Sequence, residues 1–304
     1  MIADTSTIVV GVDGSDGSLQ ALDWAVEEAT RRHLSLRVLC AWHSDYTAET
    51  VARVGGGMAD ETRSIVDAAA EHARAVSPEL DISTSAVHAQ AASALIAASR
   101  HADTVVVGAR GVGALTEAFL GSTSMQVAAY ASCPVVVVRE PSSRHGGPRR
   151  VVVGVDGSDL SNEATGYAFE QASGRGLGLT VLHAWSANVY TSGVALTALS
   201  EPWRELAAEQ ERITSEAIAQ WAATFPNVDV LVRVTQGRPA DVLVDASAGA
   251  ELVVVGSRGR GGFRGLLLGS VSRGVLHQAH CPVAVLRRFP PDDSDESDDS
   301  AGPN

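Results

Sequence analysis

Two glycine-framed segments decide how this chain is interpreted: Gly108-Ala109-Arg110-Gly111 leads to Gly121-Ser122, and Gly256-Ser257-Arg258-Gly259 leads to Gly269-Ser270. In both, a valine-rich stretch precedes the first glycine, and nine residues separate Gly-x-x-Gly from the Gly-Ser that opens an expected helix. Glycine lets backbone N–H groups turn toward an anion, and a helix N-terminus adds unpaired amides and the positive end of a dipole. Each segment is therefore a candidate phosphate-binding loop.

The alternative for a single loop of this kind is a plain turn. A second copy with the same spacing, again between an expected strand and an expected helix, favours binding. Four serines at the two expected helix starts would supply hydroxyls to phosphate oxygens or to a bound magnesium ion: Ser122, Ser124, Ser270 and Ser272.

The rest of the chain is duplicated as well. Residues 9–16 are identical to residues 152–159, and Cys-Pro-Val occurs at both 133–135 and 281–283. The period of about 145 residues suits a whole domain and is too long for a solenoid repeat. The domains are expected at residues 1–141 and 149–289, with a linker at 142–148 and a disordered acidic tail at 290–304.

Composition restricts the class of protein. With 304 residues, 45% hydrophobic and 5% aromatic, the chain can bury two cores of Val, Leu, Ile and Ala. No apolar stretch approaches the roughly 20 residues of a membrane span, and no signal peptide is evident, which predicts a cytoplasmic protein. The net charge of −13 argues against a nucleic-acid partner. Cys40, Cys133 and Cys281 are isolated, so buried thiols are favoured over zinc or redox sites.

Short apolar segments alternate with longer amphipathic ones. In the first copy, strands are expected at residues 8–12, 36–41, 82–87, 104–107 and 135–139, and helices at 18–32, 59–76, 93–101 and 122–131. In the second copy, strands are expected at residues 150–155, 179–184, 229–234, 252–255 and 283–287. Valine-rich strands separated by helices favour a parallel sheet buried on both faces. The fold class is α/β, with two tandem doubly wound domains, each a five-stranded parallel sheet flanked by helices.

Ligands of doubly wound sheets bind at the carboxyl ends of the strands. Asp13 and Asp156 follow the first strands, Ala41 and Ala184 end the second, and the glycine loops follow the fourth. The aspartates would accept hydrogen bonds from an adenine amino group or a ribose hydroxyl, and backbone groups near the alanines would contact a base edge. The alternative for Asp-Gly-Ser is a turn or helix cap. Convergence on one sheet edge favours ligand contact.

The two commonest nucleotide signatures are absent from these positions. A P-loop requires Gly-Lys-Ser or Gly-Lys-Thr, and neither loop has the lysine. A dinucleotide fingerprint would place Gly-x-Gly-x-x-Gly after the first strand, where Gly11-Val12-Asp13-Gly14 stands instead.

The loop spacing, with an aspartate after the first strand in both copies, resembles the universal stress protein family over roughly residues 5–140 and 148–288. The resemblance is to a tandem member of its ATP-binding branch, which implies ATP between the ends of the first and fourth strands. Asp13 and Asp156 would then bind adenosine. The phosphates and ribose would be held by Gly108, Gly111, Gly121 and Ser122 in one copy and by Gly256, Gly259, Gly269 and Ser270 in the other.

The resemblance also bears on partners. Magnesium would bind mainly through the ATP phosphates and water, as that ion usually does. The last strands, which open at Pro134 and Pro282, would pair the two halves in an intramolecular pseudo-dimer, and a homodimer of whole chains stays open. The pathway and any protein partner do not follow from these residues.

Binding is favoured over catalysis, because phosphoryl transfer needs a positioned nucleophile and charge stabilisation besides a phosphate cradle. Glu117 in the first loop corresponds to Gly265 in the second, so the loops share no carboxylate base. The expected function is an ATP-binding regulatory stress protein, a sensor or switch. The alternatives are a slow ATPase or autophosphorylating enzyme, with Ser122 or Ser270 as acceptor, and a scaffold that binds cyclic AMP or no nucleotide.

One departure distinguishes the copies: residues 236–240 are Gln-Gly-Arg-Pro-Ala, whereas residues 89–93 are Ala-Gln-Ala-Ala-Ser. Loss of the glycine and proline predicts a different start of the third helix in the first copy, and with it unequal sites.

Several further residues are expected to make no contact with the ligand. Loop arginines are usually solvated, and an aromatic residue at a strand end usually packs in the core, which applies to Arg110, Arg258 and Arg260 and to Trp42 and Trp185 respectively. The histidines have no shared spacing of the kind that metal ligands show: His43, His88, His183 and His277.

Overall fold

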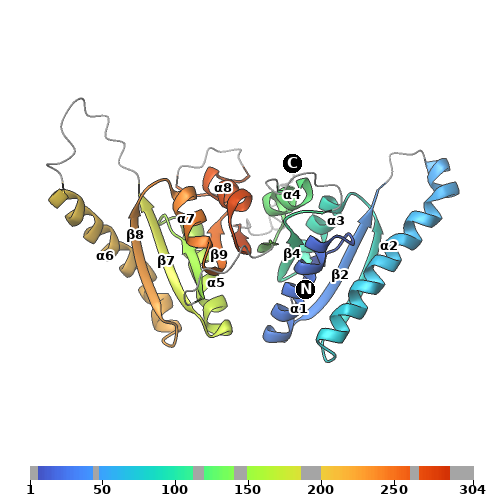
Figure 1. Cartoon of the computed structure of the whole chain (residues 1–304), viewed down its shortest axis with the longest axis horizontal. Coiled ribbons are helices and arrows are strands. Elements are labelled where there is room, and N and C mark those ends of the chain that lie inside the picture. The colour runs from blue at the N-terminus through green and yellow to red at the C-terminus, as the bar shows by residue number, and fades with distance from the viewer. Residues whose placement is uncertain are drawn as a thin grey trace, which may run out of the picture.

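The computed structural model describes residues 6–43, 48–111, 120–139, 149–185, 200–260 and 267–287. Their strands form one ten-stranded sheet in the order β3-β2-β1-β4-β5-β10-β9-β6-β7-β8. Figure 1 shows two similar halves side by side, the first coloured blue to green and the second yellow to red. The predicted linker and acidic tail lie outside the described residues.

The described residues of the first half form five strands, four α-helices and a short 3-10 helix. Its elements are β1 (Thr7–Gly11), α1 (Asp16–Arg32), β2 (Ser35–Trp42), α2 (Ala48–Val76), β3 (Ile82–His88), α3 (Ala91–Ala98), η1 (Ser99–His101), β4 (Thr104–Gly108), α4 (Ser122–Tyr130) and β5 (Val135–Val138). Apart from the helix before β3, these bounds lie within about two residues of the predicted ones, which is the usual disagreement at element ends.

The second half repeats this order. Its elements are β6 (Arg150–Gly154), α5 (Asp159–Arg175), β7 (Gly178–Trp185), α6 (Ser200–Thr224), β8 (Val230–Gln236), α7 (Pro239–Ser247), β9 (Ala250–Gly256), α8 (Ser270–Gln278) and β10 (Val283–Leu286). Neighbouring strands within each half are parallel. The prediction of two doubly wound domains, each with a five-stranded parallel sheet, is confirmed.

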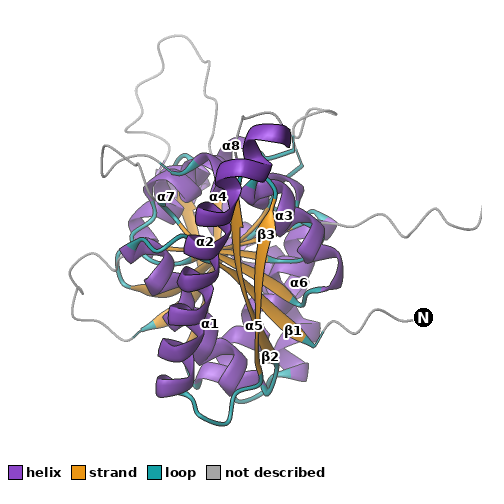
Figure 2. Cartoon of the chain, turned by 90° about the vertical axis from the view of Figure 1, so that its right-hand side faces the viewer, coloured by secondary structure: helices purple, strands orange, loops and turns teal. Residues whose placement is uncertain are grey.

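The sheet is buried on both faces. One apolar core packs α1, α2, α5 and α6 against it and includes Leu22 and Phe169, while the other packs α3, α4, α7 and α8 and includes Leu95 and Val275. Seen from the side in Figure 2, the strands run between helices on either side. Among the helices described, none is both long and apolar enough to span a membrane.

The two halves are joined edge to edge. β5 and β10 pair antiparallel, and Val136 lies opposite its own counterpart in the repeat, Ala284. A pseudo-two-fold axis therefore passes between these two residues. Arg139, after β5, donates a hydrogen bond to the carbonyl of Leu276 in α8, and Arg287, after β10, donates one to Ala129 in α4. The predicted pairing of the last strands inside one chain agrees with this arrangement.

The repeated Asp-Gly-Ser-Asp segment explains how α1 and α5 begin. The Ser15 and Ser158 side chains each accept a hydrogen bond, 3.2 Å long, from the backbone N–H of Ser18 and Ser161 respectively. Such caps satisfy amides that the helix leaves unpaired. The helix-cap alternative thus holds for the serines. The turn alternative holds for the aspartates, because Asp13 and Asp156 each accept a hydrogen bond from the backbone N–H two residues further on.

Candidate functional site

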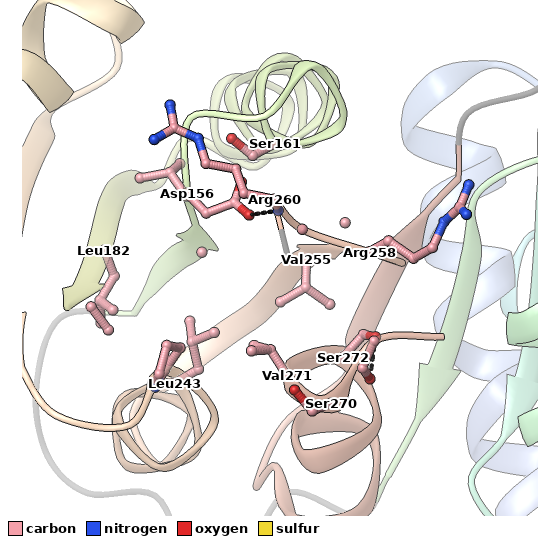
Figure 3. A pocket seen from close by; sticks show the side chains of 17 residues that line it. Asp156, Ser161, Leu182, Leu243, Val255, Arg258, Arg260, Ser270, Val271 and Ser272 are labelled. Atoms are coloured by element: carbon pink, nitrogen blue, oxygen red, sulfur yellow. Dashed lines mark hydrogen bonds between the residues drawn. The ribbon is translucent and has the colours of Figure 1, made fainter. Parts of the chain in front are cut away.

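A cavity of about 490 Å³ lies at the carboxyl ends of the second half's strands. Figure 3 shows it bordered by Asp156 on one side and by the start of α8, with Ser270 and Val271, on the other. All seven site residues predicted for this half line it: Asp156, Ala184, Gly256, Gly259, Gly269, Ser270 and Ser272. The structure therefore brings the predicted residues of the second copy together.

Asp156 is held by hydrogen bonds from two segments. Its Oδ1 accepts from the Ser158 backbone N–H at 3.0 Å and the Ser158 hydroxyl at 2.7 Å, while Oδ2 accepts from the Arg260 backbone N–H at 2.8 Å. Burial alone would raise the pKa of this carboxyl, but the hydrogen bonds from Ser158 and Arg260 and the charge of Arg260 outweigh it and hold the pKa below its usual value. Asp156 is thus ionised at neutral pH.

The aspartate and the loop's second glycine touch in both halves. A Cβ added to Gly259 would lie well inside van der Waals contact with Asp156 Oδ2, and one added to Gly111 would meet Asp13 Oδ2 in the same way. Asp13 repeats the other contacts of Asp156, since its Oδ1 accepts from the Ser15 N–H at 3.1 Å and hydroxyl at 2.6 Å. The second glycine is required because the carboxylate occupies the space of a side chain.

The start of α8 presents polar groups to the cavity. Gly269 is its N-cap, with no side chain to pair the first amides, and Ser270 is exposed at the first helical position. Unpaired amides and the helix dipole favour an anion here. Gly121 and the exposed Ser122 occupy the same positions in α4.

The other two predicted serines have a structural contact. The buried Ser124 hydroxyl donates to the Gly108 carbonyl at 2.6 Å, and the buried Ser272 hydroxyl lies 2.9 Å from the Ser257 carbonyl. Both fasten the helix start to the beginning of its glycine loop. Contact of either hydroxyl with phosphate or magnesium stays a prediction. Donation to a phosphate oxygen would require the hydroxyl to give up this bond, whereas a lone pair of the same oxygen would remain for magnesium.

The start of the third helix was predicted wrongly. Ala89 donates its N–H to Trp42 O at 2.9 Å, and its counterpart Gly237 donates to Trp185 O at 3.0 Å. The N-cap residues have nearly the same backbone, with φ −64° and ψ 134° at Gln90 and φ −73° and ψ 124° at Arg238. Gly237 does not have a positive φ, so alanine adopts the same conformation there.

In the first half, the described residues also place Asp13, Ala41, Gly108, Gly111, Gly121, Ser122 and Ser124 at the sheet edge and helix start that correspond to the cavity. Residues 112–119 of its loop lie outside the described part of the chain, as do residues 261–266 of the second loop. Glu117 and its counterpart Gly265, whose difference argued against a carboxylate base common to both loops, fall in these segments.

The aromatic and cysteine predictions have different outcomes. Trp42 is only partly buried and stacks on His88 of the neighbouring strand, with ring centroids 4.1 Å apart, so its predicted place in the core is wrong.

The thiols of the three cysteines are buried and form no disulfide, as predicted. Burial raises the pKa of Cys40 to about 11 and the pKa of Cys133 and Cys281 to about 12. No described residues form a cluster of His, Cys, Asp or Glu suited to a metal ion.

Comparison with known proteins places the chain in a family. The model of the universal stress protein family matches residues 5–139 and 147–287. The chain belongs to the universal stress protein family. A universal stress protein of Mycobacterium tuberculosis is 38% identical over 295 residues, covering 92% of this chain and 97% of that protein. One of Mycolicibacterium smegmatis is 37% identical over 292 residues, covering 92% and 96%.

A solved structure supports the fold of both halves together. The crystal structure of a universal stress protein from Archaeoglobus fulgidus covers 94% of this chain and 99% of its own, with a TM-score of 0.59 and 20% identity. At that identity the likeness concerns the fold alone.

Several residues at this universal stress protein site were missed by sequence reasoning or assigned elsewhere. Leu182, Leu243, Val255 and Val271 form apolar walls, and Figure 3 shows them facing the cavity between Asp156 and α8. They looked like ordinary core residues, and only their positions near strand and helix ends signalled a site. Arg258 and Arg260 also line the cavity and project to opposite sides of the loop, and both are exposed, as predicted.

Proposed function

We propose that this universal stress protein binds one adenine nucleotide in each half, ATP being the expected ligand, and acts as a nucleotide-dependent regulator in the cytoplasm. The observation that carries the proposal is the second-half cavity, in which an ionised carboxylate and the open start of a helix face each other across apolar walls. A nucleotide needs this combination, because its base is flat and apolar while its ribose hydroxyls and phosphates are polar and anionic.

Each part of the cavity suits one part of the ligand. Asp156 retains acceptor capacity, since a carboxylate has about four acceptor sites and three hydrogen bonds reach it. It would accept from ribose or the adenine amino group, with Leu182 and Val255 beside the base. The start of α8 would donate its unpaired amides and the Ser270 hydroxyl to phosphate oxygens. A volume of about 490 Å³ falls in the range of small-molecule sites.

The same lining supports binding over fast chemistry. Among the described residues that line the cavity, Asp156 is the one carboxylate, and its hydrogen bonds to the loop hold it away from the role of a general base. Magnesium would be held through the phosphates and water, since the described residues supply no cluster of ligands for it.

Denaturing the purified full chain and identifying the released nucleotide by chromatography and mass spectrometry tests the proposal. We expect about two adenine nucleotides per chain, mostly ATP, and about one from the Asp156→Ala variant. Asp241→Asn is the matched control, because it removes an exposed carboxylate of the same half. The absence of released nucleotide, together with no calorimetric binding of ATP, ADP or cyclic AMP, would overturn the proposal.

Turnover separates the regulator from the slow enzyme. We expect ATP hydrolysis by the wild type to equal that of the Asp13→Ala/Asp156→Ala double variant. Hydrolysis well above the double variant, or ³²P incorporated at Ser122 or Ser270, would favour the enzyme instead.

A further inference from the structure

A buried charge sits where the two halves meet on the α1 and α5 side of the sheet. Glu28 of α1 is completely buried. Its Oε1 accepts a hydrogen bond of 2.7 Å from Gln171 Nε2, and its Oε2 accepts one of 2.7 Å from Arg175, both from α5. Arg31 of its own helix completes the set. A buried carboxylate is tolerated only with partners of this kind, so the two halves satisfy it jointly.

The residues around Glu28 are related by the internal repeat. The identical segments that precede α1 and α5 align Glu28 with Gln171, Arg31 with Gly174 and Arg32 with Arg175. Equivalent residues meet at the pseudo-two-fold axis, as Val136 and Ala284 do in the sheet. Glu28 and Gln171 are therefore a pair of equivalent positions in direct contact, and they differ in charge.

Shape differs at these positions as well as charge. A Cβ on Gly174 would coincide with the Arg31 guanidinium, so the side chain of Arg31 fills the space that Gly174 leaves open. Arg31 also reaches Gln171 Oε1 at 3.3 Å. The arginine of one half thus fits a position that is empty in the other.

Outside these two positions the charges of equivalent residues are the same, but their contacts differ. Arg32 pairs with Asp103 through two contacts of 2.5 and 2.8 Å, and its counterpart Arg175 lies 3.8 Å from Glu251, the counterpart of Asp103. Arg175 additionally lies over the ring of Trp24, 5.2 Å from its centroid. The counterpart of Trp24 is Tyr167, so this contact is one-sided as well, but the differences that change charge lie at Glu28 with Gln171 and at Arg31 with Gly174.

We propose that these two unlike pairs make the interface heterotypic, so that the first half of this protein pairs with the second half and not with another copy of itself. Two first halves would set Glu28 against Glu28 in the buried centre and Arg31 against Arg31. Two second halves would give Arg175 of each copy a glutamine in place of the Glu28 carboxylate, with Glu251 at 3.8 Å as its remaining acidic contact, and would leave a void at each Gly174. Only the pairing of unlike halves satisfies charge and shape together.

The consequence is that every assembled unit contains one first-half site and one second-half site. This inference depends on the contacts between α1 and α5 and not on the proposed ligand, so its test is independent of nucleotide binding.

A protease site inserted within residues 142–148 of the full chain allows the test. The protein is folded, cut and analysed by native mass spectrometry after prolonged incubation. We expect more than 90% of the dimeric species to contain one first half and one second half. Separation of the halves, or like-with-like dimers approaching the random 1:2:1 distribution, would overturn the proposal.

Variants assign the preference to the named pair. Gln171→Glu in the cut protein, which sets two carboxylates face to face, should lower the unlike fraction or prevent folding. The swap Glu28→Gln/Gln171→Glu returns a single carboxylate to the axis and should recover the folded, unlike dimer. Gln220→Glu, on the exposed side of α6, is the matched control and should change nothing. A swap no better than Gln171→Glu alone would contradict the role of the pair.

Discussion

The two halves use the same glycine loop but rest it on different neighbours. In the first half the loop lies directly on the backbone of α1: a Cβ on Gly108 would come within 2.5 Å of the Gly17 carbonyl, and one on Gly17 within 2.8 Å of the Arg110 carbonyl. In the second half Leu160 replaces Gly17, and a Cβ on Gly256 would meet its Cγ at 3.0 Å. One loop is thus seated on backbone and the other on a side chain.

The difference bears on how firmly each loop is placed. Backbone atoms in the first turn of a helix move only if the helix moves, whereas a leucine can adjust its side-chain torsions within the staggered set. We infer that the first loop is fixed by close approach and that the second tolerates change. Among the described residues, the seating of the loop differs between the halves, whereas the starts of the third helices are alike.

Alanine at the first glycine of each loop should expose the difference most strongly. Gly108→Ala forces the loop away from α1, and we expect it to cost about 3 kcal/mol of unfolding free energy, the upper range for overpacking. Gly256→Ala requires a shift of Leu160 and a small adjustment at the Arg258 carbonyl, 3.2 Å from the added Cβ, and should cost about 1 kcal/mol. Thermal unfolding of both variants measures the contrast. Equal losses would show that the two loops are seated alike.

Alanine at the second glycine should instead affect both halves equally. Gly111→Ala and Gly259→Ala each drive a methyl group into the aspartate that would hold the nucleotide. We expect each variant to weaken one of two sites at least tenfold, about 1.4 kcal/mol, as measured by calorimetric titration with ATP. Gly249→Ala is the control, because nothing lies within 4 Å of the added Cβ. Loss of both sites from either single variant would contradict independent loops.

The hydrogen bonds of Asp156 predict a pH-dependent contribution to stability. Its pKa is lowered in the folded protein, so the contribution is complete above the unfolded value of about 3.9 and disappears as pH falls through the folded pKa. Asp156→Asn should therefore cost about 1 kcal/mol at pH 7 and progressively less below about pH 4.

Melting temperatures between pH 3 and 7 measure this loss, and a constant difference between variant and wild type across that range would refute it. Asp13→Asn is the matched variant. It shows whether the first loop, whose residues 112–119 lie outside the described part of the chain, is held to its aspartate in the same way.

The sequence predicted the parts of the fold that depend on local pattern. Valine-rich segments predicted the ten strands, and the first helix was predicted from residue 18, two residues after α1 begins at Asp16. The helix before β3 was placed at residue 59 but begins at Ala48 and continues through the glycines at 55–57. Glycine costs only about 1 kcal/mol per residue in a helix interior, which tertiary packing can offset.

Contacts between distant segments were beyond prediction. Glu28 stands on an amphipathic helix where a charge normally faces water, and only the arrangement of both halves shows that Gln171 and Arg175 bury it. The apolar cavity walls were hidden for a related reason: Leu182 and Val255 are buried like other core residues, and whether they border a cavity depends on where each strand ends. The site's polar residues were predictable because their spacing repeats.

The smallest expected effect concerns the third helices, where the halves turned out alike. Ala91 occupies the first position of α3 and Pro239 the first position of α7. The preceding Gln90 is already extended, with φ −64° and ψ 134°, as a residue before proline must be. Ala91→Pro should therefore raise the unfolding free energy by about 0.5 kcal/mol by restricting the unfolded chain, and Pro239→Ala should lower it by a similar amount. Paired melting curves resolve shifts of this size. A strong loss from Ala91→Pro would show that α3 does begin differently, and would restore the third helix as a source of inequality between the two sites.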